Sequence, residues 1–367
     1  MEENEYEGGY SPNIVGTMDA TDRKCDSCGA TMIYDPSKGM LFCEYCGSTR
    51  KIEVKDPEIL LETDLEKAED YGSHDWGKGT KSIICESCGA ESIYDELKIA
   101  DVCPYCGSTL VTEAGASDAM APGGVCGFKV TAKEAAAKFT KWIKKRIYAP
   151  GIVRKSAKAG AFQGVYLPFW TFDTDTHSFF TARYGIDRTV TVNGKTQTRT
   201  DWYNVNGNYD KFFDDVLVPG TSRYDNGTLR KIEPYDTASA VLYKPEYLAG
   251  FIAERYSVGL NDAWTGGRDR ISSTLKGLIE SEIKNEKHAD RVENLSVTTE
   301  HSNVKFKYIM LPVWLSSFKY KEKIYNFMVN GQTGKVGGRF PVAKWKVVLT
   351  VLGIIGLIAL LLWFGTR

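Results

Sequence analysis

Two sets of four cysteines have the spacing of metal ligands. The first set is Cys25, Cys28, Cys43 and Cys46, and the second set is Cys85, Cys88, Cys103 and Cys106. In each set, two Cys-x-x-Cys pairs are separated by fourteen residues, and the second set follows the first by sixty residues, cysteine for cysteine. Neighbouring residues repeat too, since Ile33-Tyr34-Asp35 matches Ile93-Tyr94-Asp95. The pattern indicates an internal duplication of a metal-binding unit.

This spacing suits a tetrahedral ion held by four thiolates. Two cysteines separated by two residues lie on one tight turn and fill two corners of a tetrahedron, and a second turn fills the other two. A glycine follows every pair and permits a sharp backbone turn, at Gly29, Gly47, Gly89 and Gly107. Zn2+ favours this geometry, and four thiolates leave no position for water or substrate. We therefore predict two structural zinc ions in two zinc ribbons.

Other uses of these cysteines are weighed against zinc. Disulfides fit poorly, because the start of the chain has no secretory signal and reduced thiols in this number favour the cytosol. Iron–sulfur ligation stays open, because the same thiolates can hold iron. Cys126 stands apart from both sets, and we expect it to be a buried structural thiol.

The elements that position the cysteines are expected in a multidomain chain. Ribbons are predicted over 21–52 and 81–114, joined by an acidic linker with a short helix over 53–80. Residues 1–20 contain five acidic and no basic residues, which predicts a disordered acidic tail. An α+β domain with an antiparallel sheet is predicted over 120–342.

Local patterns predict the main elements of the α+β domain. A capping box at Thr131-Ala-Lys-Glu134 opens a helix that runs to about Tyr148. Alternating residues after Gln163 predict strands, with a hairpin turn at Asn193-Gly194 and a further turn at Asn206-Gly207. Residues 261–287 suit a helix, and strands follow it up to a turn at Asn330-Gly331.

The end of the chain predicts a membrane anchor. The eighteen residues from Val347 to Phe364 carry no charge. At about 1.5 Å per residue they span about 27 Å, which approaches the hydrocarbon thickness of a bilayer. Lys344 and Lys346 precede the stretch and only Arg367 follows it. We predict a transmembrane helix over 345–365 in the cytoplasmic membrane with the N-terminal part in the cytoplasm, a buried core helix being the alternative.

Charge is divided unevenly along the chain. Residues 1–115 contain ten basic and twenty-four acidic residues, so the remainder carries 36 basic and 23 acidic residues. An acidic ribbon half argues against nucleic-acid binding, which needs lysine and arginine. The basic run over 129–158 keeps that alternative open. The lysines of the helix after Thr131 are either a solvated face or a contact for acidic lipid headgroups or for the ribbons.

Catalytic patterns are sparse. The chain has four histidines and no His-Glu-x-x-His, Gly-x-Ser-x-Gly or Walker sequence, so we expect neither catalytic nor cofactor-binding residues. Asp173, Asp175 and His177 share one face of a predicted strand. They form one candidate site for binding or catalysis, although polar alternation is also the ordinary pattern of a half-exposed strand.

Several longer segments resemble a bacterial family. They are Tyr-Leu-Pro-Phe-Trp-Thr-Phe-Asp at 166–173, Tyr-Leu-Ala-Gly-Phe at 247–251, and Leu-Pro-Val-Trp at 311–314 followed by Val-Asn-Gly-Gln-Thr-Gly-Lys-Val. With the two ribbons, they resemble membrane-anchored double zinc-ribbon proteins, described as transcription-factor-IIB-type zinc ribbon-containing or as primosomal protein N′ (replication factor Y) helicase-like. The resemblance covers nearly the whole chain, yet no helicase motor motif is present.

The resemblance implies cytosolic ribbons and a membrane-stress system with phage-shock-protein-A-like or SPFH-domain partners. Combined with the motifs, it predicts a non-enzymatic membrane-anchored adaptor whose ribbons dock partner proteins and which is compatible with homo-oligomerisation. Two alternatives remain, a nucleic-acid-binding factor linked to transcription or replication, and an enzyme whose site lies in the α+β domain.

Overall fold

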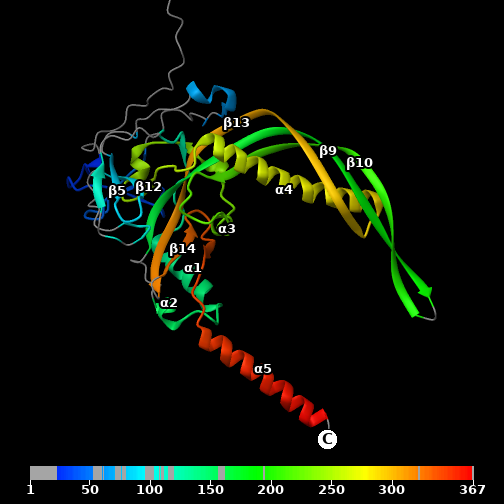
Figure 1. Cartoon of the computed structure of the whole chain (residues 1–367). Coiled ribbons are helices and arrows are strands. Elements are labelled where there is room, and N and C mark those ends of the chain that lie inside the picture. Colours follow the sequence, from blue (N-terminus) through cyan, green and yellow to red (C-terminus); the bar gives the residue numbers. More distant parts are fainter. Residues whose placement is uncertain are drawn as a thin grey trace, which may run out of the picture.

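The structure, a computed structural model, describes residues 23–52, 60, 62–70, 76, 80–95, 103–106, 108, 111–114, 120–155, 162–192, 195–320 and 323–365. The acidic tail expected over 1–20 and part of the linker expected over 53–80 lie outside these residues. The described residues form one large mixed sheet, a small three-stranded sheet and five α-helices (Figure 1). The helices are α1 (Ala132–Lys144), α2 (Gly151–Lys155), α3 (Asn226–Arg230), α4 (Leu260–Lys287) and α5 (Lys344–Gly365).

Two very long strands form the centre of the large sheet. β9 (Gln163–Val192) and β13 (Arg291–Tyr320) pair antiparallel along most of their length. β10 (Lys195–Pro219) pairs with β9, and β14 (Lys323–Asn330) pairs with β13. Because β13 begins opposite Gly185, β9 and β10 continue beyond that point as a two-stranded arm that curves away from the body (Figure 1).

The predicted hairpin is confirmed, but the second predicted turn is wrong. Val192 pairs with Lys195, and the two turn residues between them lie outside the described part of the chain. Asn206 and Gly207 lie within β10, where Gly207 pairs with Phe180. A Cβ at Gly207 would lie 2.9 Å from the Phe180 ring. This glycine therefore makes room for an aromatic ring across the strand pair rather than a turn.

The predicted helix over 261–287 is confirmed as α4, which lies along one face of the long strands (Figure 1). Its buried residues recur every four positions, at Ala263, Gly267, Ile271, Leu275, Ile279 and Ile283. They pack on aromatic residues of the sheet such as Trp170 and Phe172. A Cβ at Gly267 would lie 3.2 Å from the Phe172 ring, so this small residue allows the helix to approach the sheet closely.

The repeated Leu-Pro segments lie side by side in this sheet. Leu167 of β9 pairs with Leu311 of β13, so the two segments run antiparallel and the two leucines lie opposite each other. Each proline carbonyl accepts a hydrogen bond of 2.8 Å from a glycine N–H: Pro168 from Gly220, and Pro312 from Gly331. The repetition in the sequence therefore corresponds to equivalent positions in the fold.

The large sheet is mixed: its long strands pair antiparallel, as predicted, but two of its short strands pair parallel, which the prediction did not include. Its order is β11-β8-β13-β9-β12-β6-β5-β7, and β8 runs parallel to β13 while β12 runs parallel to β9. Long connections deliver these short strands to the sheet in that direction. The short strands are β4 (Thr63–Asp64), β5 (Thr80–Cys85), β6 (Glu91–Asp95), β7 (Val111–Ala114), β8 (Gly124–Val125), β11 (Val241–Leu242), β12 (Ile252–Glu254) and β15 (Val336–Gly338).

The second ribbon belongs to the large sheet. Its strands β6 and β7 both pair with β5, and β6 also pairs with β12 through Tyr94 and Ile252. Tyr94 and Ile252 are buried in one hydrophobic cluster with Val165 of β9. The expected division into separate domains is not confirmed, because hydrogen bonds and core packing both continue from this ribbon into the rest of the molecule.

The first ribbon forms its own sheet from β1 (Ile33–Asp35), β2 (Met40–Phe42) and β3 (Thr49–Arg50). It contacts the segment 247–251 that carries part of the family resemblance. The Tyr34 N–H donates to the Ala249 carbonyl over 3.1 Å, and the Tyr34 ring lies against Tyr247 and Phe251. A Cβ at Gly127 would lie 2.7 Å from the Tyr34 hydroxyl. Tyr34 is therefore one of the residues through which the first ribbon packs onto the body.

The predicted capping box and helix are confirmed in α1. The Thr131 hydroxyl accepts from the Glu134 N–H, and the Glu134 carboxylate accepts from the Thr131 N–H over 2.8 Å. Phe139 and Ile143 are buried against the body, whereas Ile147, within the range predicted for the helix, lies beyond its end at Lys144 and is exposed. In the expected linker, the described helical segment is a 3-10 helix over Leu65–Asp70.

Candidate metal centres

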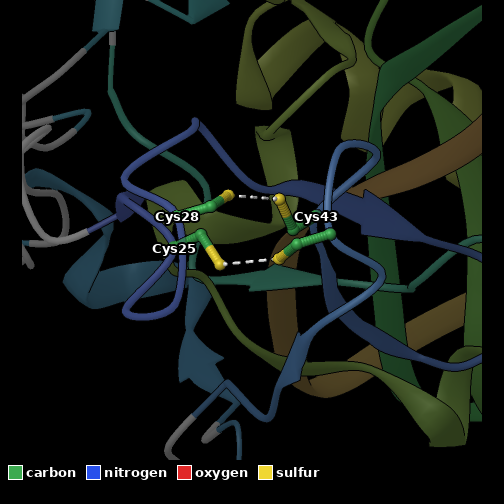
Figure 2. Close-up of side chains that lie close together, drawn as sticks. Cys25, Cys28 and Cys43 are labelled. Atoms are coloured by element: carbon green, nitrogen blue, oxygen red, sulfur yellow. Dashed lines mark hydrogen bonds between the residues drawn. The ribbon is translucent and has the colours of Figure 1, made fainter.

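The sulfur atoms of the first cysteine set converge on one point (Figure 2). The Sγ atoms of Cys25 and Cys46 are 3.4 Å apart, and those of Cys28 and Cys43 are 3.5 Å apart. Four sulfurs about 2.3 Å from one zinc ion would lie about 3.8 Å from one another, whereas a disulfide needs about 2.05 Å. The set has nearly the size of a tetrahedral thiolate site, and all four cysteines are free thiols.

Backbone hydrogen bonds shape the turns that carry these sulfurs. The Gly29 N–H donates to the Cys25 carbonyl over 2.8 Å, and the Gly47 N–H donates to the Cys43 carbonyl over 2.9 Å. Both glycines have a positive φ, of 73° and 77°. The N–H of Ser27 is the largest influence on Cys25 and lowers the pKa of its thiol to about 6. Such donors stabilise a thiolate, which is the form that binds a metal.

The second set repeats this geometry. The Sγ atoms of Cys85 and Cys106 are 3.7 Å apart, and those of Cys88 and Cys103 are 3.8 Å apart. Burial raises the pKa of Cys85, but the N–H groups of Cys88 and Ser87 outweigh it, so the pKa is lowered overall. Both sets could hold a metal ion and are compatible with zinc.

In the second ribbon, the turn that carries Cys85 and Cys88 is fixed to the body by Arg223. Its guanidinium donates to the Cys88 carbonyl over 3.3 Å and to the Gly89 carbonyl over 2.8 Å. The same side chain lies 3.2 Å from the carboxylate of Glu254 on β12, which is fully buried. Thr221 donates to that carboxylate over 2.6 Å. Burial raises the pKa of Glu254 to about 7, although Thr221 and Arg223 partly oppose this effect.

The two ribbons differ at one duplicated tyrosine. Tyr45 and Tyr105 occupy the same place in their Cys-x-x-Cys turns, yet Tyr45 is 84% exposed and Tyr105 is 6% exposed. Tyr105 packs beside Tyr224, and its hydroxyl lies 3.4 Å from the Ser92 hydroxyl. In the second ribbon, the tyrosine of the Cys103–Cys106 turn is therefore covered by the body. The corresponding turn of the first ribbon presents its tyrosine to solvent.

Asp173, Asp175 and His177 do not form one site. Asp173 is buried in the sheet, whereas the other two are exposed. Asp175 accepts from the Asn303 side chain over 2.9 Å, and His177 pairs with Asp210 across the strand. The structure thus separates the three predicted residues into three different environments.

Asp173 instead belongs to a cluster formed at a β-bulge. The pairing of β9 and β10 shifts at Asp214 and Asp215, and the carboxylates of both residues come close to that of Asp173. Lys307 lies 2.7 Å from Asp215 and 3.3 Å from Glu62, so an ammonium group already neutralises part of the cluster. Burial raises the pKa of Asp173 to about 7. The arrangement is a partly buried ion-pair network around Asp173.

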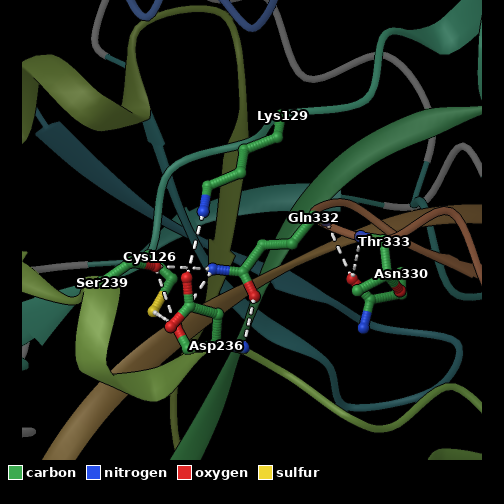
Figure 3. Close-up of polar contacts among 7 residues, drawn as sticks. All are labelled: Cys126, Lys129, Asp236, Ser239, Asn330, Gln332 and Thr333. Atoms are coloured by element: carbon green, nitrogen blue, oxygen red, sulfur yellow. Dashed lines mark hydrogen bonds and ion pairs between the residues drawn. The ribbon is translucent and has the colours of Figure 1, made fainter.

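Cys126 is a buried structural thiol, as predicted (Figure 3). Its Sγ lies 3.7 Å from the Asp236 carbonyl, and burial raises its pKa to about 12. The Asp236 carboxylate pairs with Lys129 over 3.2 Å, and the backbone N–H of Asp236 donates to the side-chain oxygen of Gln332 over 3.0 Å. Asn330 accepts from the Gln332 N–H over 2.8 Å. This network ties the turn after β14 to the body, and the neutral thiol is a poor nucleophile.

Comparison with known proteins adds one relative. No protein-family model and no solved structure matches the chain. The chain is 28% identical over 338 residues to a Bacillus subtilis (strain 168) protein described as "Uncharacterized protein YdjG", covering 91% of this chain and 94% of that protein. The similarity thus extends over nearly the full length of both chains, and the description assigns no activity or ligand.

Proposed function

We propose that this chain is a non-enzymatic, membrane-anchored adaptor whose first zinc ribbon docks a partner protein. The proposal depends on the contrast between Tyr45 and Tyr105. A duplicated module that leaves one copy's aromatic residue 84% exposed, while the other copy's is covered, has one copy available for docking. Exposed tyrosines are frequent energetic centres of protein interfaces.

The closed metal sites support a docking role rather than catalysis. Four thiolates around one tetrahedral ion leave no open coordination position, so zinc at either site would stabilise the turns and would not activate water. The metal would hold Cys43 and Cys46 on either side of Tyr45 and would thereby fix that side chain for recognition. Glu44, next to Tyr45 in the sequence, is exposed and favours a partner with a basic surface.

The apolar helix α5 supports membrane anchoring. The segment Lys344–Phe364 is long and apolar enough to cross a membrane, and its apolar stretch is not buried against the rest of the structure. An exposed apolar surface of this length is unstable in water and is satisfied by a bilayer. Lys344 and Lys346 at its start favour placing the body in the cytoplasm. By the family resemblance, phage-shock-protein-A-like or SPFH-domain proteins are candidate partners.

The experiment places a photo-crosslinking amino acid at position 45 of the full-length chain in cells. A crosslinked partner is expected at position 45 and not at the control position Lys276, an exposed residue of α4. Cys28→Ser, which removes a metal ligand beside that surface, should abolish the crosslink. The chain should stay in the membrane fraction after alkaline washing, and deletion of 344–365 should release it. Equal crosslinking at both positions would refute a docking role for the first ribbon.

A further inference from the structure

We propose that the end of α1 and the segment leading into α2 form a second membrane contact, which recognises anionic lipid headgroups and holds the body against the bilayer. This inference depends on the proposed anchoring by α5 and extends it. It rests on three observations: where α5 begins, which apolar side chains are exposed beside it, and how charge is distributed there.

The start of α5 is bonded to the segment between α1 and α2. The Ala343 N–H donates to the Tyr148 carbonyl over 2.9 Å. The Lys346 ammonium donates to the carbonyls of Ile147 and Ala149 over 3.0 and 2.7 Å. These bonds fix the segment next to the point where the chain would enter the bilayer, and Figure 1 shows α1 and α2 at the end of the body from which α5 leaves. A membrane that receives α5 must therefore lie close to this segment.

Large apolar side chains are exposed at this place. Ile147 and Ile152 are 62% and 56% exposed, and Val342 and Trp345 beside them are 51% and 63% exposed. Each lies within a few residues of the hydrogen bonds that join the segment to α5. Apolar side chains gathered at the root of a membrane helix fit the interfacial layer of a bilayer, where aliphatic and indole groups are stabilised.

The charge around these side chains is almost entirely positive. Residues 129–155 contain nine basic residues and one acidic residue. Lys141, Lys144 and Lys145 are exposed at the end of α1. Arg146 is held in place, because its guanidinium lies 3.5 Å from the centroid of the Trp142 ring and donates to the Trp142 carbonyl over 2.7 Å. Basic groups beside exposed apolar groups match the headgroup and acyl layers of an anionic bilayer.

The experiment compares the full-length chain reconstituted in vesicles of phosphatidylcholine alone and in vesicles with one-third phosphatidylglycerol. Hydrogen–deuterium exchange of residues 145–153 is measured in both. We expect exchange to be slowed about 25-fold more in the anionic vesicles, because Lys144 and Lys145 near such a surface each add about fivefold to binding.

Two variants and one matched control test the chemistry. Lys144→Glu with Lys145→Glu should remove the lipid-dependent slowing, and Ile147→Ser with Ile152→Ser should weaken protection in both vesicle types. The control, Lys195→Glu with Lys276→Glu, makes the same charge change at exposed lysines of the arm and of α4 and should leave the slowing intact. Equal slowing in the Lys144/Lys145 variant and the control would overturn the headgroup contact.

The outcomes separate this inference from the anchoring by α5. If the chain resists alkaline washing from both vesicle types but residues 145–153 exchange equally in both, the anchor stands and the second contact is refuted. If alkaline washing strips the chain from both types but 145–153 are protected only in anionic vesicles, the anchor fails and the headgroup contact stands. Absence of both effects refutes both.

Discussion

Replacement of Arg223 by methionine tests whether the second ribbon is coupled to the body. Arg223 is the only charged partner of the buried Glu254 carboxylate among the ion pairs of the described residues, and it also bonds the carbonyls of Cys88 and Gly89. Methionine keeps much of the aliphatic volume and removes all of these donors. The variant therefore removes one electrostatic contact and two hydrogen bonds and leaves every metal ligand in place.

The expected loss depends on pH. Glu254 has a pKa of about 7 in the folded chain against an ordinary value of 4.5, so its ionised form opposes folding by about 3 kcal/mol above pH 7. A raised carboxyl pKa means that stability falls as pH rises from about 4.5 to about 7. Without Arg223 the pKa rises further. We expect a loss of about 3 kcal/mol at pH 8, from the lost hydrogen bonds and from the larger cost of ionising Glu254 without its partner. At pH 6 Glu254 is protonated, and only about 2 kcal/mol from the hydrogen bonds remains.

Thermal unfolding of the zinc-loaded chain in a mild detergent measures this loss. At about 2 °C per kcal/mol, Tm should fall by about 6 °C at pH 8 and about 4 °C at pH 6. Adding Glu254→Gln to Arg223→Met should restore the pH-dependent part of the lost stability, because the glutamine carries no charge and its amide oxygen can still accept from Thr221. Arg339→Met is the matched control, since Arg339 is 70% exposed and its ion pair with Asp225 is worth about 0–1 kcal/mol.

Two results would refute the coupling. One is a Tm for Arg223→Met that falls no further than that of Arg339→Met. The other is an equal fall at pH 6 and pH 8, which would mean that Glu254 is not the group that Arg223 stabilises. Zinc content, measured by elemental analysis, should remain near that of the wild-type chain in every variant.

Three further predictions concern other parts of the chain. Cys88→Ser should halve the zinc content of the chain and speed amide exchange in β12, whereas Cys28→Ser should halve the zinc content without changing exchange in β12. Unchanged exchange in both variants would show that the second ribbon does not stabilise β12. Asp173→Asn should flatten the fall in Tm between pH 5 and pH 8, because burial raises the pKa of Asp173 to about 7 and its ionisation opposes folding above that pH; an unchanged pH profile would argue against its titration there. Gly250→Ala should lower Tm by about 2–4 °C, since Gly250 has a φ of 86° and a Cβ there would lie 3.3 Å from Ile33. The control Gly353→Ala, in α5, brings its Cβ near no other atom and should not lower Tm.

Local signals in the sequence located the metal sets and most of the regular elements. Cysteine spacing predicted both quartets because each Cys-x-x-Cys turn is built from neighbouring residues and a short hairpin. The capping box at Thr131 and the apolar period of α4 are likewise properties of adjacent turns. The Asn206-Gly207 error has the same origin, since a turn-forming dipeptide also serves where a ring from another strand needs space.

The candidate site in the α+β domain was misplaced for a different reason. Period-two alternation grouped Asp173 with Asp175 and His177, but a bulge in β10 brings Asp215 to Asp173, and β13 supplies Lys307. No local pattern places residues 42 positions apart in contact. Asn303 and Asp215, which have positive φ at bulges beside this cluster, become informative only once the strand register is known.

The sequence by itself predicted two sets of four cysteines that could each hold a metal ion, and an uncharged stretch, Val347 to Phe364, that is long enough as a helix to cross a bilayer. Both conclusions depend on contiguous residues, whose geometry is set by bond lengths and helical rise. Only the tertiary structure decided that the second ribbon joins the large sheet through β6 and β12, and that Tyr45 is exposed while Tyr105 is covered. Two copies of one motif have the same local geometry, and their different surroundings come from contacts with distant segments that motif spacing does not encode.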